Sequence, residues 1–244
     1  MEMDNEKNVM EMNNERYSRQ TMLPEIGTEG QRRLAAARVA VIGLGGLGSA
    51  VLPYLAGAGV GSLVLVDPDT VSLSNLQRQV LYSQDEIGQP KALCAARRIA
   101  ALNGDVSVTA VPEALGEDNG RDIIAGCDLV VDCTDNFATR YLIDDICAGV
   151  GLPWVYGSIG EFAGQVAVLN HRSGVRYRDI YPDREALCAL PRVTRGVLGA
   201  VPGVIGTIQA SEALKLIIGC GNTLDGRLLV MNLLTMESDI IDLR

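Results

Sequence analysis

The chain has 244 residues, of which 48% are hydrophobic, and this is enough for one α/β domain of generous size. Its net charge of −9 and its pI near 4.7 argue against a protein that binds nucleic acid or an anionic membrane surface. The N-terminus lacks the apolar region of a signal peptide, and the apolar stretch 50–66 is shorter than the ~20 residues that span a bilayer. These features predict a cytoplasmic protein.

The N-terminal residues 1–15 are polar and aperiodic, and we expect a disordered tail followed by a single domain over 16–244. Arg16 and Arg19 lie three residues apart, so both would face the same side of a short helix. On its own, such a pair is usually a solvated pair of arginines. A short helix is predicted within 24–37, directly before the first strand.

The stretch 39–69 is predicted to form a strand, a glycine-rich turn, a helix and a second strand. Gly43, Gly45 and Gly48 fit the pattern G-x-G-x-x-G, which lets backbone N–H groups approach a phosphate at a helix N-terminus. Asp67 ends the second strand, where a carboxylate can accept hydrogen bonds from a ribose. The sequence therefore predicts a nucleotide site and leaves the nucleotide open.

Residues 70–89 show little periodicity, which is unusual directly after a strand and indicates a functional segment. Its polar side chains that would border the nucleotide are Asn75, Arg78 and Gln79. Lys91 follows Pro90 and begins a helix predicted over 91–102. A cation is unfavourable at a helix N-terminus unless an anion joins it, which favours a phosphate contact for Lys91.

A further strand, 129–132, ends in the sequence Asp132-Cys-Thr-Asp-Asn136. Ligands of open parallel sheets bind outside the carboxyl ends of the strands. Asp135 lies just past such an end, and a carboxylate beside a triphosphate is a natural Mg²⁺ ligand. The alternative, that Asp135 or Asn136 caps the next helix, is compatible with this role.

The other predicted elements complete an α/β fold. We expect a Rossmann-like, mostly parallel sheet with helices on both faces and an antiparallel C-terminal extension. A crossing loop is predicted over 171–195. The predicted strands are 107–111, 154–157, 162–169, 227–233 and 240–243, and the predicted helices are 118–125, 140–150 and 206–218.

Two reaction classes fit a glycine turn followed by an acidic residue. An NAD-dependent oxidoreductase commonly needs a group for proton transfer, and the one histidine, His171, lies in the predicted crossing loop. Attack of a carboxylate on the α-phosphate of ATP needs no general base, because the carboxylate is already ionised near pH 7. Such a reaction requires positioning and charge neutralisation by Arg, Lys and Mg²⁺, and those side chains are present.

The chain resembles the ThiF/MoeB/HesA family, the bacterial relatives of the adenylation domains of ubiquitin-activating enzymes. The resemblance runs from about Arg16 to the C-terminus. It depends on seven motifs taken together: Arg16-Tyr-Ser-Arg-Gln20, Gly43-Leu-Gly-Gly-Leu-Gly-Ser49, Asp67-x-Asp69, Ser74-Asn-Leu-Gln-Arg-Gln79, Gly88-Gln-Pro-Lys91, Asp132-Cys-Thr-Asp-Asn136 and Gly206-Thr-Ile-Gln-Ala210.

This resemblance implies an ATP- and Mg²⁺-dependent homodimeric adenylyltransferase. Its substrate would be the C-terminal Gly-Gly carboxylate of a small ubiquitin-like sulfur carrier protein in thiamine, molybdopterin or related biosynthesis. Asp67 would hold the ribose, with Asp69 in the same site. Asp135 would coordinate Mg²⁺, and Arg19 would reach the ATP of the neighbouring subunit. The groups expected around the phosphates are Gly43, Gly45, Gly46, Gly48, Asn75, Arg78, Gln79 and Lys91. Catalysis would depend on Arg19, Arg78, Lys91 and Asp135.

Several alternatives stay open beside this interpretation. The alternative within the same fold is adenylation of a small-molecule or peptide carboxylate, or of a modified tRNA base. An NAD-dependent oxidoreductase is the alternative of another class. A non-catalytic binding partner with the same fold is a third, and the complete set of charged site residues argues against it.

The chain departs from the family at its cysteines. Many members hold a structural zinc with two C-x-x-C pairs, but Arg176 and Asp179 stand at the first pair and no second pair precedes Arg244, so zinc is not expected. Where related enzymes carry a cysteine in the crossing loop, this chain has Arg192, with Cys188 four residues upstream. Cys188 is either a shifted reactive thiol favoured by nearby arginines or an incidental cysteine. In the second case a separate protein or sulfide would donate sulfur.

Overall fold

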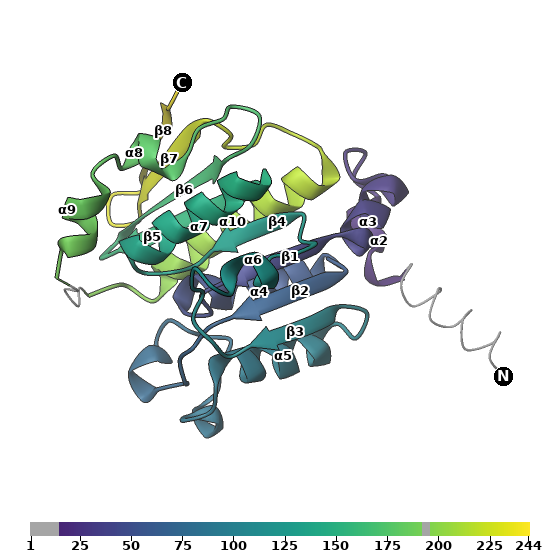
Figure 1. Ribbon diagram of the computed structural model, residues 1–244. Coiled ribbons are helices and arrows are strands. Elements are labelled where there is room, and N and C mark those ends of the chain that lie inside the picture. Colours follow the sequence, from purple (N-terminus) through teal and green to yellow (C-terminus); the bar gives the residue numbers. More distant parts are fainter. Residues whose placement is uncertain (1–14, 192–195) are drawn as a thin grey trace.

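The computed structural model of the chain describes residues 15–191 and 196–244. Arg192 and nearly all of the predicted tail 1–15 therefore lie outside the described residues. Within them, eight strands form one sheet in the order β3-β2-β1-β4-β5-β6-β7-β8, and helices cover both of its faces (Figure 1). The predicted α/β class is confirmed. The strands are β1 (Arg38–Ile42), β2 (Ser62–Val66), β3 (Ser107–Val111), β4 (Leu129–Asp132), β5 (Trp154–Gly160), β6 (Ala163–Leu169), β7 (Arg227–Asn232) and β8 (Glu237–Asp242).

The strands β1 to β5 are parallel. β1, β2, β4 and the first part of β5 are apolar and buried on both faces, whereas the edge strand β3 is half-buried or exposed along its length. Along β1, Val39 and Val41 belong to one hydrophobic core, whereas Ala40 and Ile42 belong to the other. Such continuous apolar runs are readable from the sequence, and the predicted bounds of β3 and β4 agree with the structure.

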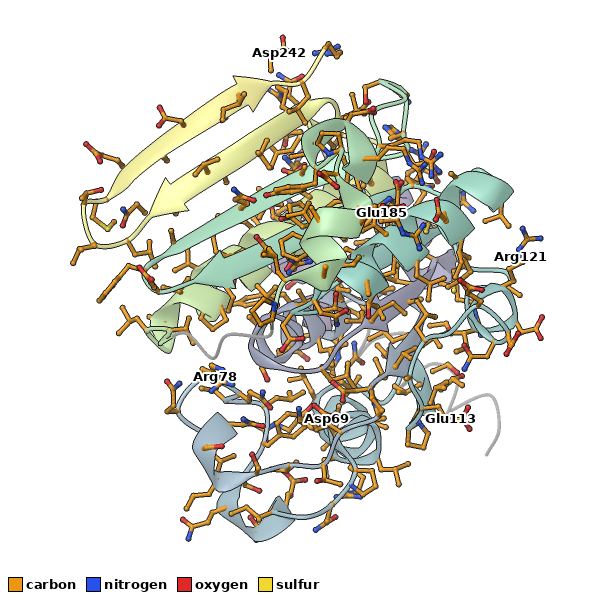
Figure 2. All side chains as sticks on the ribbon, turned by 60° about the vertical axis from the view of Figure 1, so that its left-hand side comes forward. Asp69, Arg78, Glu113, Arg121, Glu185 and Asp242 are labelled. Carbon is orange, nitrogen blue, oxygen red and sulfur yellow. The ribbon has the colours of Figure 1, made fainter. Side chains whose placement is uncertain are left out.

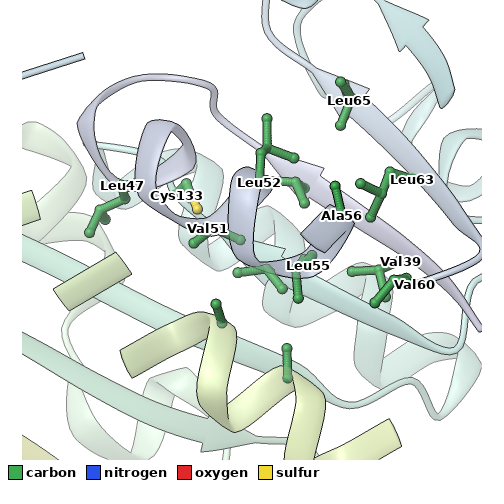
Figure 3. Close-up of a cluster of buried hydrophobic side chains, with 14 of the residues drawn as sticks. Val39, Leu47, Val51, Leu52, Leu55, Ala56, Val60, Leu63, Leu65 and Cys133 are labelled. Atoms are coloured by element: carbon green, nitrogen blue, oxygen red, sulfur yellow. The ribbon is translucent and has the colours of Figure 1, made fainter. Parts of the chain in front are cut away.

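Two layers of helices enclose the parallel sheet. Residues of α3, α4, α5 and α10 contribute to one core, and residues of α6, α7, α8 and α9 contribute to the other. Figure 3 shows Val51, Leu52 and Leu55 of α4 in the first of these cores, near the strand residues Val39 and Leu63. The helices are α2 (Ser18–Thr21), α3 (Gly27–Ala36), α4 (Gly46–Gly57), α5 (Lys91–Leu102), α6 (Gly120–Ile123), α7 (Phe137–Val150), α8 (Tyr177–Ile180), α9 (Arg184–Ala189) and α10 (Ala200–Ile218).

The C-terminal strands form the predicted antiparallel extension. β6 pairs antiparallel with β5, β7 with β6, and β8 with β7. β8 is the edge of the sheet, and all six of its residues are exposed. It begins three residues earlier than the predicted strand 240–243, because its first half is polar and lacks the apolar pattern of a core strand.

Two sequence-based predictions need correction. The segment predicted as irregular, 171–195, carries the short helices α8 and α9 in its described part. The last long helix begins at Ala200 instead of residue 206, because Pro202 is tolerated in a first helical turn and Gly206 packs against the backbone of Leu47. Glycine and proline had lowered the helical signal of that stretch.

Helix α10 is long and apolar enough to cross a membrane by length and composition alone. In the fold it packs against α4, β5 and β6, and its buried Gln209 donates to the carbonyl oxygen of Asp132 at 2.6 Å. The helix is therefore part of the protein core.

Candidate active site

The predicted site residues gather at the carboxyl ends of β1, β2 and β4. The sheet order changes direction between β1, which continues to β2 and β3 on one side, and β4 on the other. Ligands of open α/β sheets bind at such a switch point. The residues 70–89 border this region and contain two 3-10 helices, η1 (Leu73–Asn75) and η2 (Gln84–Glu86).

The glycine turn packs so tightly that side chains are excluded at two of its positions. Gly43 has φ +89°, and a Cβ there would lie 2.7 Å from the carbonyl oxygen of Cys133. A Cβ on Gly48 would lie 2.5 Å from the carbonyl oxygen of Gly43. These two glycines therefore hold the turn against β4 and against the first turn of α4.

The N-terminus of α4 is open to a ligand. Its N-cap residue is Gly45, and no side chain caps the helix. Within the described residues, the backbone N–H groups of the first turn, Gly46 to Gly48, have no hydrogen-bond acceptor. Free N–H groups and the helix dipole together suit an anion such as a phosphate.

Asp67 anchors the glycine turn from β2. Its Oδ2 accepts from the backbone N–H of Leu44 at 2.6 Å, and its Oδ1 accepts from that of Asp69 at 2.8 Å. Burial raises the pKa of the Asp67 carboxyl, and the Leu44 N–H and Lys91 partly oppose this shift. Tyr82 donates to the carbonyl oxygen of Leu44 at 2.8 Å, so the turn is held at both backbone groups of this residue. A contact of Asp67 with a ribose stays a prediction, and it would share oxygens that already accept these bonds.

Lys91 and Asp69 form an ion pair beside this anchor. The Lys91 Nζ lies 3.0 Å from Asp69 Oδ2, and the backbone N–H of Lys91 donates to the Asp69 carbonyl oxygen at 2.9 Å. The lysine side chain is only 4% exposed, whereas that of Asp69 is 68% exposed. The sequence predicted an anion beside Lys91 at the N-terminus of α5, and in this structure the carboxylate of Asp69 is that anion.

The segment 70–89 brings its polar side chains to the same edge. Figure 2 shows Arg78 and Asp69 on the same side of the molecule, and Arg78 is half-buried with Nη1 3.2 Å from the Ser74 carbonyl oxygen. The backbone carbonyl of Asn75 accepts from the N–H groups of Arg78 and Gln79. Gln79 is buried beside Gly45, and its Oε1 has no hydrogen-bond partner within the described residues.

Asp135 is the exposed apex of a fixed turn. Asp132 Oδ1 accepts from both the N–H and the hydroxyl of Thr134, at 2.9 and 2.7 Å, which holds one side of the turn. Asn136 holds the other side, because its Oδ1 accepts from the N–H of Thr139 and caps α7. The cap role thus belongs to Asn136, and the carboxylate of Asp135 is accessible to a ligand.

These residues fit a magnesium nucleotide. The free N–H groups of α4 and the cations Lys91 and Arg78 suit phosphates, and the buried acceptor Oε1 of Gln79 has no hydrogen-bond partner within the described residues. In the described ranges, 15–191 and 196–244, no three acidic, histidine or cysteine side chains group as a metal site. A lone carboxylate is nevertheless sufficient for Mg²⁺ that arrives with phosphates, because Mg²⁺ typically combines one or two carboxylates with substrate phosphates.

Arg19 lies away from this cluster, and Cys188 lies on a helix packed against α7. Arg19 is exposed on α2, whose Gln20 donates to the carbonyl oxygen of Ala58 just past the C-terminal end of α4, whereas the site lies at the N-terminal end of that helix. Arg19 therefore faces the opposite edge of the sheet from the site of its own chain. Cys188 is exposed on α9, on the face of the sheet covered by α7.

Arg176 and Asp179 hold the beginning of α8 without a cysteine. The N–H of Arg176 donates to Asp179 Oδ2 at 2.8 Å, and its guanidinium lies 2.9 Å from the buried Asp144 of α7. Asp144 also pairs with Arg178, and the neighbouring Asp145 of α7 pairs with Arg184. An ionic cluster therefore connects α8 and α9 to α7.

Sequence reasoning assigned no role to Tyr82, Arg140 or Gln209, which support the site from within the fold; Gln209 stands in the motif 206–210 that carried the resemblance. Gln209 and Tyr82 donate to backbone carbonyls of the β4 end and the glycine turn. Arg140 donates to the carbonyl oxygen of Thr134 at 2.8 Å. The bonds of Tyr82 and Gln209 link residues far apart in the chain, so no local pattern could have indicated their partners, whereas the bond of Arg140 spans six residues.

Comparison with known proteins agrees with this geometry. A sequence model of the ThiF family matches residues 17–244. The SAMP-activating enzyme E1 of Haloferax volcanii is 46% identical over 231 residues, covering 94% of this chain and 85% of that protein. The sulfur carrier protein adenylyltransferase of Thermus thermophilus is 46% identical over 226 residues, covering 90% of this chain and 83% of that protein.

A solved structure shows the same fold. The crystal structure of PaaA superposes with a TM-score of 0.81 at 24% identity, covering 95% of this chain and 74% of that chain. The family model and the two relatives confirm the resemblance inferred from the seven motifs. The chain belongs to the ThiF family and is an ATP-using adenylyltransferase.

Proposed function

We propose that this protein adenylates the C-terminal Gly-Gly carboxylate of a small ubiquitin-like sulfur carrier protein, with Mg²⁺-ATP as the second substrate. One observation carries the proposal: the N-terminus of α4 is uncapped, Arg78 lies against its first residue Gly46, and the turn that carries Asp135 packs against Gly43. The two relatives, named for activating or adenylating carrier proteins, support the choice of substrate. The product would serve sulfur transfer in thiamine, molybdopterin or related biosynthesis in the cytoplasm.

The chemistry requires positioning and no general base. The attacking carboxylate is ionised near neutral pH, and it forms a bond to the α-phosphorus as the bond to pyrophosphate breaks. The free N–H groups of α4, together with Lys91 and Arg78, would stabilise the charge on the phosphates. Asp135 would hold Mg²⁺, which neutralises phosphate charge when bound.

We further propose that the protein acts as a homodimer in which Arg19 serves the site of the neighbouring subunit. The position of α2 supports this, since Arg19 lies at the opposite edge of the sheet from its own site. Mixing Arg19→Ala with Asp135→Ala protein would test the idea. Recovery of activity in the mixture supports sharing between subunits, and two variants that stay inactive together contradict it.

Pyrophosphate exchange into ATP tests the adenylation step. We expect exchange that requires Mg²⁺ and a carrier ending in Gly-Gly, and we expect Asp135→Ala and Arg78→Ala to abolish it while the far-UV spectrum is unchanged. Exchange driven by a small-molecule or peptide carboxylate, with no response to carriers, would replace the carrier in this proposal. Binding of NAD without binding of ATP would contradict the proposal itself.

A further inference from the structure

The turn that carries Asp135 is held from below by a buried arginine. Arg140, on the first turn of α7, is only 7% exposed, and its Nη2 donates to the carbonyl oxygen of Thr134 at 2.8 Å. A second, longer contact joins the same nitrogen to the carbonyl oxygen of Gly157 at 3.5 Å. Because Thr134 directly precedes Asp135 in the chain, this bond fixes the backbone on which the Asp135 carboxylate stands.

Arg140 also faces the carboxylate that shapes the turn. Its Nε lies 3.5 Å from Oδ2 of Asp132, which is fully buried, and neither atom has a hydrogen-bond partner within the described residues. Removing the charge of Arg140 would leave the Asp132 carboxylate buried and uncompensated. The other oxygen of Asp132 accepts the two bonds from Thr134. One buried ion pair therefore contacts the turn at two points.

Aromatic rings keep this ion pair away from water. The guanidinium carbon of Arg140 lies 5.5 Å from the ring centre of Tyr156 and 5.9 Å from that of Phe137. Trp154, the single tryptophan of the chain, lies 6.3 Å from Tyr156 between ring centres. Planar guanidinium groups stack on aromatic faces and donate in a fixed fork, and a lysine ammonium reproduces neither property.

We propose that Arg140 is a positioning residue for Mg²⁺: it places the Asp135 carboxylate by fixing the Thr134 carbonyl group from the buried side of the turn. The inference depends on the proposed function, in which Asp135 holds the metal. Residues that orient a metal ligand typically contribute ten- to hundredfold to metal affinity. A purely structural arginine would instead affect stability and leave the Mg²⁺ dependence unchanged.

Calorimetric titration of ATP at a series of Mg²⁺ concentrations tests this role without any turnover. We expect Arg140→Lys, which keeps the charge beside Asp132, to weaken the apparent Mg²⁺ affinity about tenfold or more. ATP binding in the absence of Mg²⁺ should change less than twofold. Trp154 fluorescence should keep its emission maximum, which reports that the aromatic cluster is still packed. The matched control is Arg121→Lys on α6, an exposed arginine, which should behave as the wild type.

A second variant loosens the turn without touching the buried arginine. Thr134→Val removes the hydroxyl bond to Asp132 at a half-buried position, and we expect a several-fold loss of apparent Mg²⁺ affinity in a folded protein. Unchanged Mg²⁺ dependence in Arg140→Lys, or in Thr134→Val if the former does not fold, overturns the positioning role. If wild type and Asp135→Ala show the same Mg²⁺ dependence, the metal role of Asp135 fails first, and the inference fails with it.

Discussion

The substitution Gly43→Ala tests whether close packing of the glycine turn against β4 maintains the site. Gly43 adopts φ +89°, a conformation that a residue with a side chain rarely adopts. Its new Cβ would lie 2.7 Å from the carbonyl oxygen of Cys133 and 3.0 Å from the N of Thr134, whereas ordinary contact begins at 3.4 Å. All of the nearest atoms belong to backbone, so no flexible side chain can move away.

Two costs add in this variant. The left-handed backbone conformation costs about 1–2 kcal/mol for a residue with a Cβ, and overpacking a tight contact costs about 1–3 kcal/mol. The expected loss in the free energy of unfolding is therefore about 2–5 kcal/mol. The displaced atoms belong to the turn that carries Asp135, so binding of Mg²⁺-ATP should weaken as well.

Urea unfolding and calorimetric ATP titration measure the two effects. The matched control is Gly57→Ala at the C-terminal end of α4, the helix that follows the glycine turn. A Cβ at Gly57 meets nothing within 4 Å. This change should stabilise the protein by up to about 1 kcal/mol, since alanine favours the helical state over glycine. A Gly43→Ala protein that unfolds within about 0.5 kcal/mol of the wild type, a range typical of neutral surface changes, would refute the packing argument.

Two further predictions concern Asp67 and Cys188. Burial raises the pKa of Asp67. A carboxyl with a raised pKa contributes most to the free energy of unfolding below its unfolded pKa of about 3.9. This contribution is lost as the pH rises through the folded pKa. Urea melts from pH 3.5 upward should therefore show the wild type losing stability relative to Asp67→Asn as the pH rises, and a difference of opposite slope would contradict this. Cys188 is exposed on α9, and attack of a carboxylate on ATP needs no thiol, so Cys188→Ala should leave pyrophosphate exchange unchanged; a large loss would assign a role to the thiol.

The sequence predicted the parallel half of the fold well because its inner strands β1, β2 and β4 are buried on both faces. Continuous apolar runs then mark the strands, and the helix 91–102 is bounded by Pro90 and Asn103 as predicted. Apolar runs did not predict element bounds correctly where burial is one-sided or absent. β8 is exposed on both faces, and α10 begins in a stretch rich in glycine and proline whose helical state depends on packing against α4.

The candidate site was predictable to the extent that its residues follow the ends of strands. Asp67 and Asp135 could be placed at the carboxyl edge because parallel strands end together there. Two of the bonds that hold the site could not be predicted because they join distant segments, Tyr82 to Leu44 and Gln209 to the end of β4. The bond from Arg140 to Thr134 spans only six residues, but it depends on how the turn and the first turn of α7 fold against each other. These are tertiary contacts, and their partners are defined only after the chain has folded.

The ion pair of Lys91 and Asp69 indicates how an acidic protein receives a polyanion. With a net charge of −9, the chain repels a triphosphate at long range, so attraction must come from local cations and N–H groups. Lys91 is 4% exposed and held in place by the fold, whereas Asp69 is 68% exposed. The carboxylate is therefore the partner that can turn away when a phosphate approaches, at a small cost because its new surroundings are solvent. In the proposed function, the buried ammonium would stay in position and exchange the carboxylate of Asp69 for a phosphate, so that the core would need no rearrangement to bind ATP.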